Sequence, residues 1–423
     1  MSRTLAAIAS LLLATAILYT GNGLQTTLLA LRGSLEGFSD PVVGALASAY
    51  FVGFIAGCRY NPGVIKSAGH IRAFVSFASV ASASALAHAV VVDPIVWAVL
   101  RCVTGFCFAG IAMVLESWIN ARASNASRGQ VLSLYRIVDL SALTIGNALL
   151  ATASPAGFHL FAVVSILISI ALVPVALTRA SAPEPGGAAR LDIAKLFAVS
   201  PVAVIGAAAS GLGNAAFWGM GPVYAQSLGY APGEIGLFVS AVIVGGATSQ
   251  WPLGWMSDRV DRRIVLLGST FFGALAAYAV GRFGPSGQTA LLATAFLFGV
   301  CIIPTFGISA AHANDHADPS EAVSTNGGLL LLHGLGSAIG AFAGGAVMAA
   351  FAPSALFLYI GGVYAGVSVI CALRILTAPA VSSEDKSPFS PIAKNAAPTV
   401  FEIQDGEAVD EGAVQPAEDI DAA

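Results

Sequence analysis

The chain has 423 residues, of which 57% are hydrophobic and only 10% are charged. A soluble globular protein carries about 25% charged residues, so this composition argues against a soluble enzyme, a nucleic-acid-binding protein and a disordered chain. The formal net charge of −4 is an average over segments of opposite sign. The five cysteines and six histidines form no metal-ligand or redox motif, so we expect no metal and no cofactor.

Twelve apolar segments follow one another along the chain. A bilayer core about 30 Å thick is crossed by about 20 residues of helix. Segments of that kind lie near residues 4–30, 41–60, 72–92, 95–120, 129–152, 157–178, 200–226, 234–255, 264–282, 288–311, 322–350 and 353–376. The first begins after Arg3 like a signal peptide, but the eleven spans that follow favour a retained helix. The prediction is an all-α integral membrane protein with twelve transmembrane helices.

Basic residues gather on one side of the expected membrane. When the loops are assigned alternately to two sides, only Arg32 and Arg282 fall opposite the termini, whereas most of the 19 lysines and arginines share the side of the termini. The positive-inside rule then places both termini in the cytoplasm. Residues 377–423 hold ten acidic residues against two lysines, which predicts an acidic, disordered cytoplasmic tail.

A polar stretch rich in proline and glycine divides the spans into six and six. The expected units are a six-helix bundle over 1–178, a cytoplasmic linker over 179–199 with a short amphipathic helix, a second six-helix bundle over 200–376, and the tail over 377–423. A shift of 192 residues places Asn22, Gly44 and Ser48 on Asn214, Gly236 and Ser240, and a shift of 194 places Gly105 and Asp139 on Gly299 and His333. Two parallel repeats are typical of transporters with a central site.

The loop after the eighth span carries the most specific motif, Gly254-Trp-Met-Ser-Asp258-Arg259-Val-Asp261-Arg262-Arg263. It resembles a signature of the major facilitator superfamily (MFS), with Asp261 where the family has glycine. Arg101 followed by Gly105 and Gly110 resembles a second signature, and Glu116-Ser-Trp118-Ile-Asn120 resembles the bacterial YcaD-like branch. The resemblance covers residues 4–376. It implies an MFS-like fold and a solute transporter in a bacterial-type inner (plasma) membrane.

The motif also has a physical interpretation of its own. A carboxylate among guanidinium groups forms charge-assisted hydrogen bonds between helix ends. We therefore expect a cytoplasmic gating loop that latches the two bundles in one state; its members are Gly254, Asp258, Arg259, Arg262 and Arg263. Ordinary cytoplasmic positive charge is the alternative. The segment with His312, Asp315, His316, Asp318 and Glu321 is expected to be a solvated loop, with a metal site as its alternative.

Four ionisable residues lie inside spans: Arg101 and Glu116 in the fourth, and Arg136 and Asp139 in the fifth. A charge near the bilayer centre costs at least about 2.5–3.5 kcal/mol, so such residues are usually paired or functional. Asp139 is the first candidate for proton coupling and Glu116 the second, with ion pairs of Arg136 to Asp139 or to Glu116 as structural alternatives. Arg101 either holds an anionic group or snorkels outward, and His333 either lines the cavity or is a packing group.

Further polar residues in the spans are candidates to line a substrate cavity, with helix–helix hydrogen bonding as the competing role. They are Asn22, Gln25, Asn147, Asn214, Trp218 and Asn326. The chain lacks a GxxxxGK[ST] loop, so an ion gradient is the expected energy source.

The predicted function is secondary active transport of a small organic solute by alternating access, coupled to protons. The expected partners are that solute, protons and the lipid bilayer, without nucleic acid, and the expected state is a monomer. The alternative is a transporter-like sensor or scaffold that signals through the acidic tail. No nucleophile–base or metal constellation in the sequence supports an enzyme.

Overall fold

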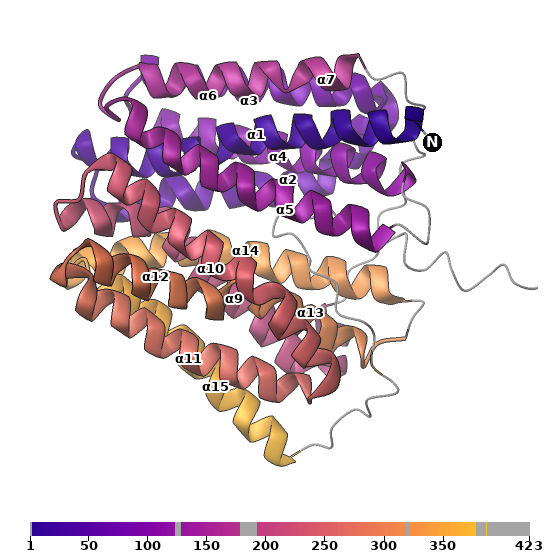
Figure 1. The fold of residues 1–423 in the computed structure, drawn as a ribbon, viewed down its shortest axis with the longest axis vertical. Helices are drawn as coiled ribbons and strands as arrows, with labels where there is room; N and C mark the ends of the chain where they lie inside the picture. Colours follow the sequence, from indigo (N-terminus) through magenta and orange to yellow (C-terminus); the bar gives the residue numbers. More distant parts are fainter. Residues whose placement is uncertain (1, 123–127, 178–192, 319–320, 378–385, 387–423) are drawn as a thin grey trace, which may run out of the picture.

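The computed structural model describes residues 2–122, 128–177, 193–318, 321–377 and 386, and this part of the chain is helical without strands (Figure 1). The first half holds α1 (Ser2–Leu35), α2 (Asp40–Ala68), α3 (His70–Val90), α4 (Pro94–Arg122), α5 (Arg128–Ala148), η1 (Leu149–Thr152), α6 (His159–Ile170) and α7 (Leu172–Ala176). A short helix α8 (Ile193–Val199) follows. The second half holds α9 (Pro201–Ser227), α10 (Pro232–Arg259), α11 (Arg262–Phe283), η2 (Gly284–Ser286), α12 (Gln288–Ile302), α13 (Thr305–Asn314), α14 (Ala322–Ala350) and α15 (Ala355–Thr377).

Eleven helical segments from α2 to α15 are long and apolar enough to cross a membrane. Helix α1 has 34 residues, about 51 Å at 1.5 Å per residue, and completes the twelve-helix pattern. Large apolar side chains such as Trp251 and Leu376 remain 76% and 83% exposed, as expected where lipid covers the surface. The predicted all-α membrane fold is confirmed. The expected tail lies outside the described residues except for Thr377 and Lys386.

Two expected spans are interrupted rather than continuous. The sixth divides into α6 and α7, and the tenth divides into α12 and α13. Pro174 lies in α7, three residues after the first break, and Pro304 lies in the second break; a proline removes one intrahelical donor and crowds the preceding turn. The two breaks therefore follow from residues that a count of apolar length ignores.

Side chains at several helix starts explain why the spans begin where they do. Asp93 Oδ1 accepts hydrogen bonds from the amides of Ile95 and Val96, both at 2.9 Å, at the start of α4. Ser200 Oγ accepts from Ala203 N at 3.3 Å before α9. Such caps satisfy amide groups that have no partner within the helix.

The two halves repeat one backbone arrangement. In the first half, α4 approaches α2 so closely that a Cβ on Gly105 would collide with the carbonyl oxygen of Tyr50. In the second half, a Cβ on Gly299 would collide with the carbonyl oxygen of Val242, between α12 and α10. Gly299 is the repeat equivalent of Gly105 at a shift of 194, and Val242 that of Tyr50 at a shift of 192. The sequence repeat is therefore a structural repeat.

The interface between the halves follows the same approximate two-fold relation. Gly44 of α2 lies against Ala341 of α14, and Gly236 of α10 lies against Asn147 of α5. Gly44 and Gly236 are equivalent at a shift of 192, and their partners Asn147 and Ala341 are equivalent at a shift of 194. Ser48 Oγ adds a hydrogen bond accepted from Phe342 N at 3.1 Å. Figure 1 shows α9–α15 approaching α1–α7 at this end and tilting away toward the side of the N-terminus. The close contacts lie at the helix ends that the charge pattern assigns to the outside.

Candidate functional site

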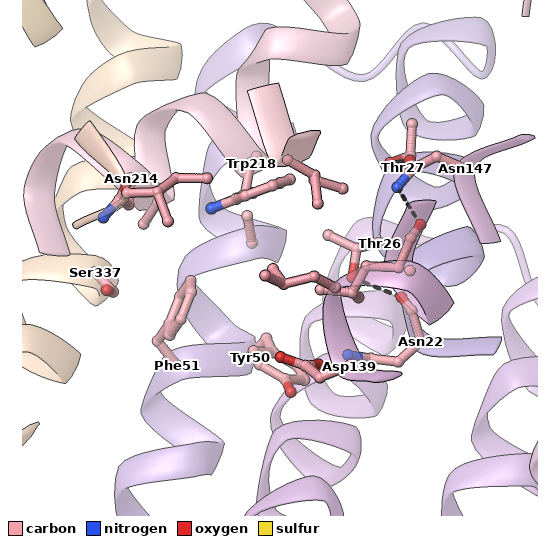
Figure 2. Close-up of a pocket in the computed structure, with 18 of the residues that line it drawn as sticks. Asn22, Thr26, Thr27, Tyr50, Phe51, Asp139, Asn147, Asn214, Trp218 and Ser337 are labelled. Atoms are coloured by element: carbon pink, nitrogen blue, oxygen red, sulfur yellow. Dashed lines mark hydrogen bonds between the residues drawn. The ribbon is translucent and has the colours of Figure 1, made fainter. Parts of the chain in front are cut away.

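A cavity of about 120 Å³ lies between the two halves, and both contribute side chains to its wall (Figure 2). Eight predicted cavity residues line it: Asn22, Arg101, Arg136, Asp139, Asn147, Asn214, Trp218 and His333. Two pairs among them are repeat equivalents, Asn22 with Asn214 and Asp139 with His333. Figure 2 shows Asn214 and Ser337 across the cavity from Asn22 and Asp139. The cavity therefore lies on the approximate two-fold axis.

Arg136 and Asp139 of α5 form an ion pair. Their spacing of three residues places both side chains on one face of the helix, and each side chain is less than 10% exposed. Arg136 thus pairs with Asp139 and not with Glu116, the other partner considered from the sequence. Removing one member of a buried pair typically costs about 3–5 kcal/mol because the remaining charge is left unpaired.

Arg101 of α4 lies at the cavity wall and is only 4% exposed. Its guanidinium carbon lies 4.6 Å from the centre of the Tyr50 ring. This cation–π contact is worth about 2 kcal/mol where water is excluded. The side chain therefore turns inward over Tyr50 and does not snorkel to the surface.

The uncharged polar residues of the wall differ in how fully their hydrogen bonds are satisfied. Thr27 Oγ1 donates to Asn147 Oδ1 at 2.6 Å, and Asn147 Nδ2 donates to Leu143 O at 2.8 Å. Ser210 Oγ lies 2.9 Å from His333 Nδ1. Among the described residues, by contrast, neither amide atom of Asn214 has a hydrogen-bond partner. Asn147 therefore acts as a link between α1 and α5, whereas Asn214 presents free polar atoms.

The structure does not bring Gln25, Glu116 or Asn326 to this cavity. Gln25 points about 130° away from the face of α1 that lines it, at about 100° per residue. Glu116 lies about 22 Å farther along α4 than Arg101. There it is 2% exposed and accepts a hydrogen bond from the Tyr135 hydroxyl at 3.5 Å. Asn326 exchanges hydrogen bonds with Asn314 of α13 at 3.1 and 3.3 Å.

Several wall residues were not predicted from the sequence: Thr26, Thr27, Tyr50, Phe51 and Ser337. Thr26 lies one turn from Asn22 on the same face of α1, so helical periodicity signals it. Tyr50 and Phe51 lie in an apolar span whose rotation the sequence does not fix. Ser337 lies one turn from His333 and is signalled in the same way as Thr26.

The residues of the predicted gating loop lie at the opposite end of the second half from the Gly236–Asn147 contact. Arg262 is 1% exposed and donates to both carboxylate oxygens of Asp315 at 2.6 and 3.3 Å. It also donates to Asp258 Oδ1 at 3.1 Å and to Ser257 Oγ at 3.0 Å. Asp315 was expected in a solvated loop, and that expectation is wrong, because its side chain is buried against Arg262.

The neighbouring arginines of the loop have other partners. Arg263 donates to Asp261 at 2.7 Å and to the carbonyl oxygen of Arg374 in α15 at 2.9 Å. Arg259 lies 4.1 Å from the ring centre of Trp255. Gly254 O accepts from Ser257 Oγ at 2.8 Å within α10. These interactions join α10, α11, α13 and α15, all in the second half.

Asp261 lies between the spans α10 and α11. Partial burial acts to raise the pKa of this carboxyl, but hydrogen bonds and charge from Arg263 outweigh it and hold the pKa below its ordinary value of 3.8. The carboxylate form is therefore favoured at neutral pH. His312, His316 and Lys386 lie beside this cluster, and no group of metal-ligating side chains occurs in the described ranges.

Comparison with known proteins finds similarity to major facilitator superfamily transporters. Residues 203–404 match the family model described as Major Facilitator Superfamily. A relative from Salmonella newport, named an uncharacterized MFS-type transporter YcaD, is 25% identical over 336 residues, covering 79% of this chain and 86% of its own. These relatives are transporters and not enzymes.

Solved structures share the fold. The nucleoside transporter NupG superposes with a TM-score of 0.73 at 13% identity, covering 88% of this chain and 100% of its own. The Escherichia coli fucose:proton symporter FucP gives a TM-score of 0.55 at 14% identity, covering 87% and 98%. The repeated six-helix architecture, the family match and the YcaD-type relatives agree: the chain is similar to transporters of the major facilitator superfamily and shares their fold.

Proposed function

We propose that the protein is a secondary active transporter that moves a small organic solute by alternating access. The cavity on the approximate two-fold axis carries this proposal, because its wall combines equivalent residues of both repeats. A site in that position changes its exposure when one half rocks against the other. The rocking units are the bundles of residues 1–178 and 200–376, joined by the linker 179–199.

The contacts between the halves support a state that is closed at one end. Gly44 with Ala341 and Gly236 with Asn147 bring backbones together at the end where α2 and α10 begin. With both termini in the cytoplasm of an inner membrane, that end faces outward. The cavity is therefore sealed from the outside in this conformation, and the gating-loop cluster near the other end holds the second bundle together.

Asp139 is the proposed proton carrier. When it takes up a proton from one side, the ion pair with Arg136 loses its negative member, and the cavity gains one positive charge. Release of the proton to the other side restores the pair. Solute transport and proton transport are coupled because solute in the neighbouring cavity changes the free energy of protonating Asp139. The structural neighbour FucP is a fucose:proton symporter, which agrees with this type of coupling.

Purified protein in liposomes that contain a pH-sensitive dye tests both transport and coupling. Candidate solutes from three classes (nucleosides, sugars and carboxylates) are added outside, with and without an imposed pH gradient. We expect at least one class to move protons in wild type and not in Asp139→Asn. Glu36→Gln removes a carboxylate far from the cavity and serves as the matched control.

The outcomes separate the two parts of the proposal. Solute uptake that ignores the pH gradient would reject proton coupling and leave transport standing. Equal proton flux in wild type and Asp139→Asn would reject Asp139 as the carrier, and Glu116→Gln then tests the second candidate. No uptake of any of the three classes by folded wild-type protein would count against transport itself.

A further inference from the structure

Arg101 is the cavity cation whose charge the described residues leave unmatched. The other guanidinium of the wall, Arg136, is neutralised by Asp139. Arg101 is 96% buried, as its 4% exposure shows, and it packs on the uncharged ring of Tyr50. Its Nη1 atom has no hydrogen-bond partner among the described residues. A buried, unmatched charge inside a membrane is usually functional.

The rest of the wall indicates what surrounds a ligand of Arg101. Most of the lining is apolar and includes Leu140, Leu143, Ile243 and Ile303. The free neutral polar atoms are Asn22 Oδ1, the Tyr50 hydroxyl, the Asn214 amide and the Ser337 hydroxyl, which have no hydrogen-bond partner in the described part of the chain. The cavity therefore offers one unmatched cation, four neutral hydrogen-bonding groups and an apolar surface.

We propose that Arg101 binds the carboxylate of a small organic monoanion, which is the class of solute that the transporter carries. This inference rests on the proposed function. A guanidinium offers a planar fork that matches a carboxylate, and a single unmatched cation favours one negative charge over two. The apolar walls favour a hydrocarbon body. Size sets a limit as well: the cavity measures about 120 Å³, of the same order as the roughly 150 Å³ cavity that holds benzene, so the organic body is no larger than about one ring.

Benzoate is a suitable probe because it combines one carboxylate with a single apolar ring, and benzamide is its neutral counterpart. Binding to the full-length protein in detergent is measured by calorimetry and by the shift of the unfolding temperature. We expect benzoate to bind wild type and benzamide to bind at least about tenfold more weakly. Acetate carries the charge without the ring and is expected to bind more weakly than benzoate.

Arg101→Gln should weaken benzoate binding by about tenfold to a hundredfold. Arg282→Gln is the matched control, because Arg282 also packs on an aromatic ring, at 5.6 Å from the centre of Phe283, but lies outside the cavity. Arg101→Lys keeps the charge and loses the fork, so intermediate affinity is expected. Circular dichroism and monodisperse elution show whether each variant is folded.

Three outcomes would overturn the inference: no benzoate binding to wild type, equal binding of benzoate and benzamide, or equal benzoate affinity in wild type and folded Arg101→Gln. These binding measurements do not require transport. If the liposome experiment shows proton-coupled uptake of a neutral solute that Arg101→Gln leaves unchanged, the anion inference fails while the proposed function stands. If benzoate binds through Arg101 but no solute crosses the membrane, the proposed function fails instead.

Discussion

Replacing Gly44 by alanine should open the sealed end of the transporter. A Cβ at this position would lie 2.5 Å from the carbonyl oxygen of Ala341 and 3.1 Å from Cα of Phe342. Ordinary contact begins near 3.4 Å, so α2 and α14 must separate by about 0.9 Å. The obstacle is backbone on both helices, which no side-chain rotation removes. The strain therefore acts on the contact between the halves.

The magnitude follows from known costs of overpacking, about 1–3 kcal/mol. Alanine also improves the helix by about 0.5–1 kcal/mol relative to glycine, but α2 is helical in both states, so this gain cancels from their ratio. A penalty of about 1–3 kcal/mol on the closed end corresponds to roughly a 5- to 150-fold shift in the ratio of closed to open molecules. The open state has no such contact, so the methyl group causes no overpacking there.

Double electron–electron resonance measures this shift directly. Spin labels are attached at Glu36→Cys and Phe351→Cys, two sites at the sealed end, after the five native cysteines have been replaced. We expect Gly44→Ala to populate longer distances. Gly268→Ala is the control, since a Cβ there meets no atom within 4 Å. If the distance distribution of Gly44→Ala matches that of Gly268→Ala, the contact between Gly44 and Ala341 does not seal the transporter.

Three further predictions concern the gating-loop cluster and Asp261 beside it. Asp315→Asn should lower stability by about 3–5 kcal/mol because it leaves Arg262, 1% exposed, without its bidentate anion. Asp258→Asn should lower the free energy of unfolding by less than about 1 kcal/mol, since the carboxylate of Asp258 is 33% exposed. It should nevertheless lower the initial rate of solute uptake at unchanged membrane abundance. A normal uptake rate would reject the predicted latch between the two bundles. The lowered pKa of Asp261 beside Arg263 means that its contribution to stability is complete above about pH 4 and is lost as pH falls through the lowered pKa. The difference in unfolding temperature between wild type and Asp261→Asn should therefore shrink from pH 7 to pH 3, and a constant difference would contradict this assignment.

The sequence predicts the spans and the repeat well because both depend on local or periodic patterns. Apolar length fixes where helices cross a bilayer, and the 192-residue shift already pairs Asn22 with Asn214. The spans that were predicted to be continuous and are interrupted in the structure are those with a proline at or near the interruption, such as Pro304. The fold was therefore predictable to within a few residues at most helix ends.

The cavity was harder to predict because it depends on helix rotation and depth. Gln25 and Asn22 are both polar residues of α1, yet only Asn22 lies on the face that lines the cavity. Glu116 shares α4 with Arg101, but about 22 Å of helix separates them. The burial of Asp315 depends on Arg262, 53 positions earlier in the chain. Contacts of that kind require the packing of α11 against α13, which no local pattern specifies.

The repeat explains the backbone, but the charges have diverged between the halves. At a shift of 194, Arg101 and Arg136 correspond to Ala295 and Leu330, which are buried apolar residues. At a shift of 192, Asp258 and Arg262 correspond to Lys66 and His70, and His70 stacks on Trp118 at 5.9 Å between ring centres.

The first half thus holds the cavity charges that we assign to ligand and proton, and the second half holds the arginine–aspartate cluster at the end away from the contacts between the halves. This separation has a mechanical consequence. A ligand that binds to Arg101 alters the charge balance of the first half, whereas Arg262 and Asp315 link α11 to the end of α13 within the second half. The free energy of binding therefore acts at the interface of α2 with α14 and of α5 with α10, where the two halves meet and where a rocking motion must begin.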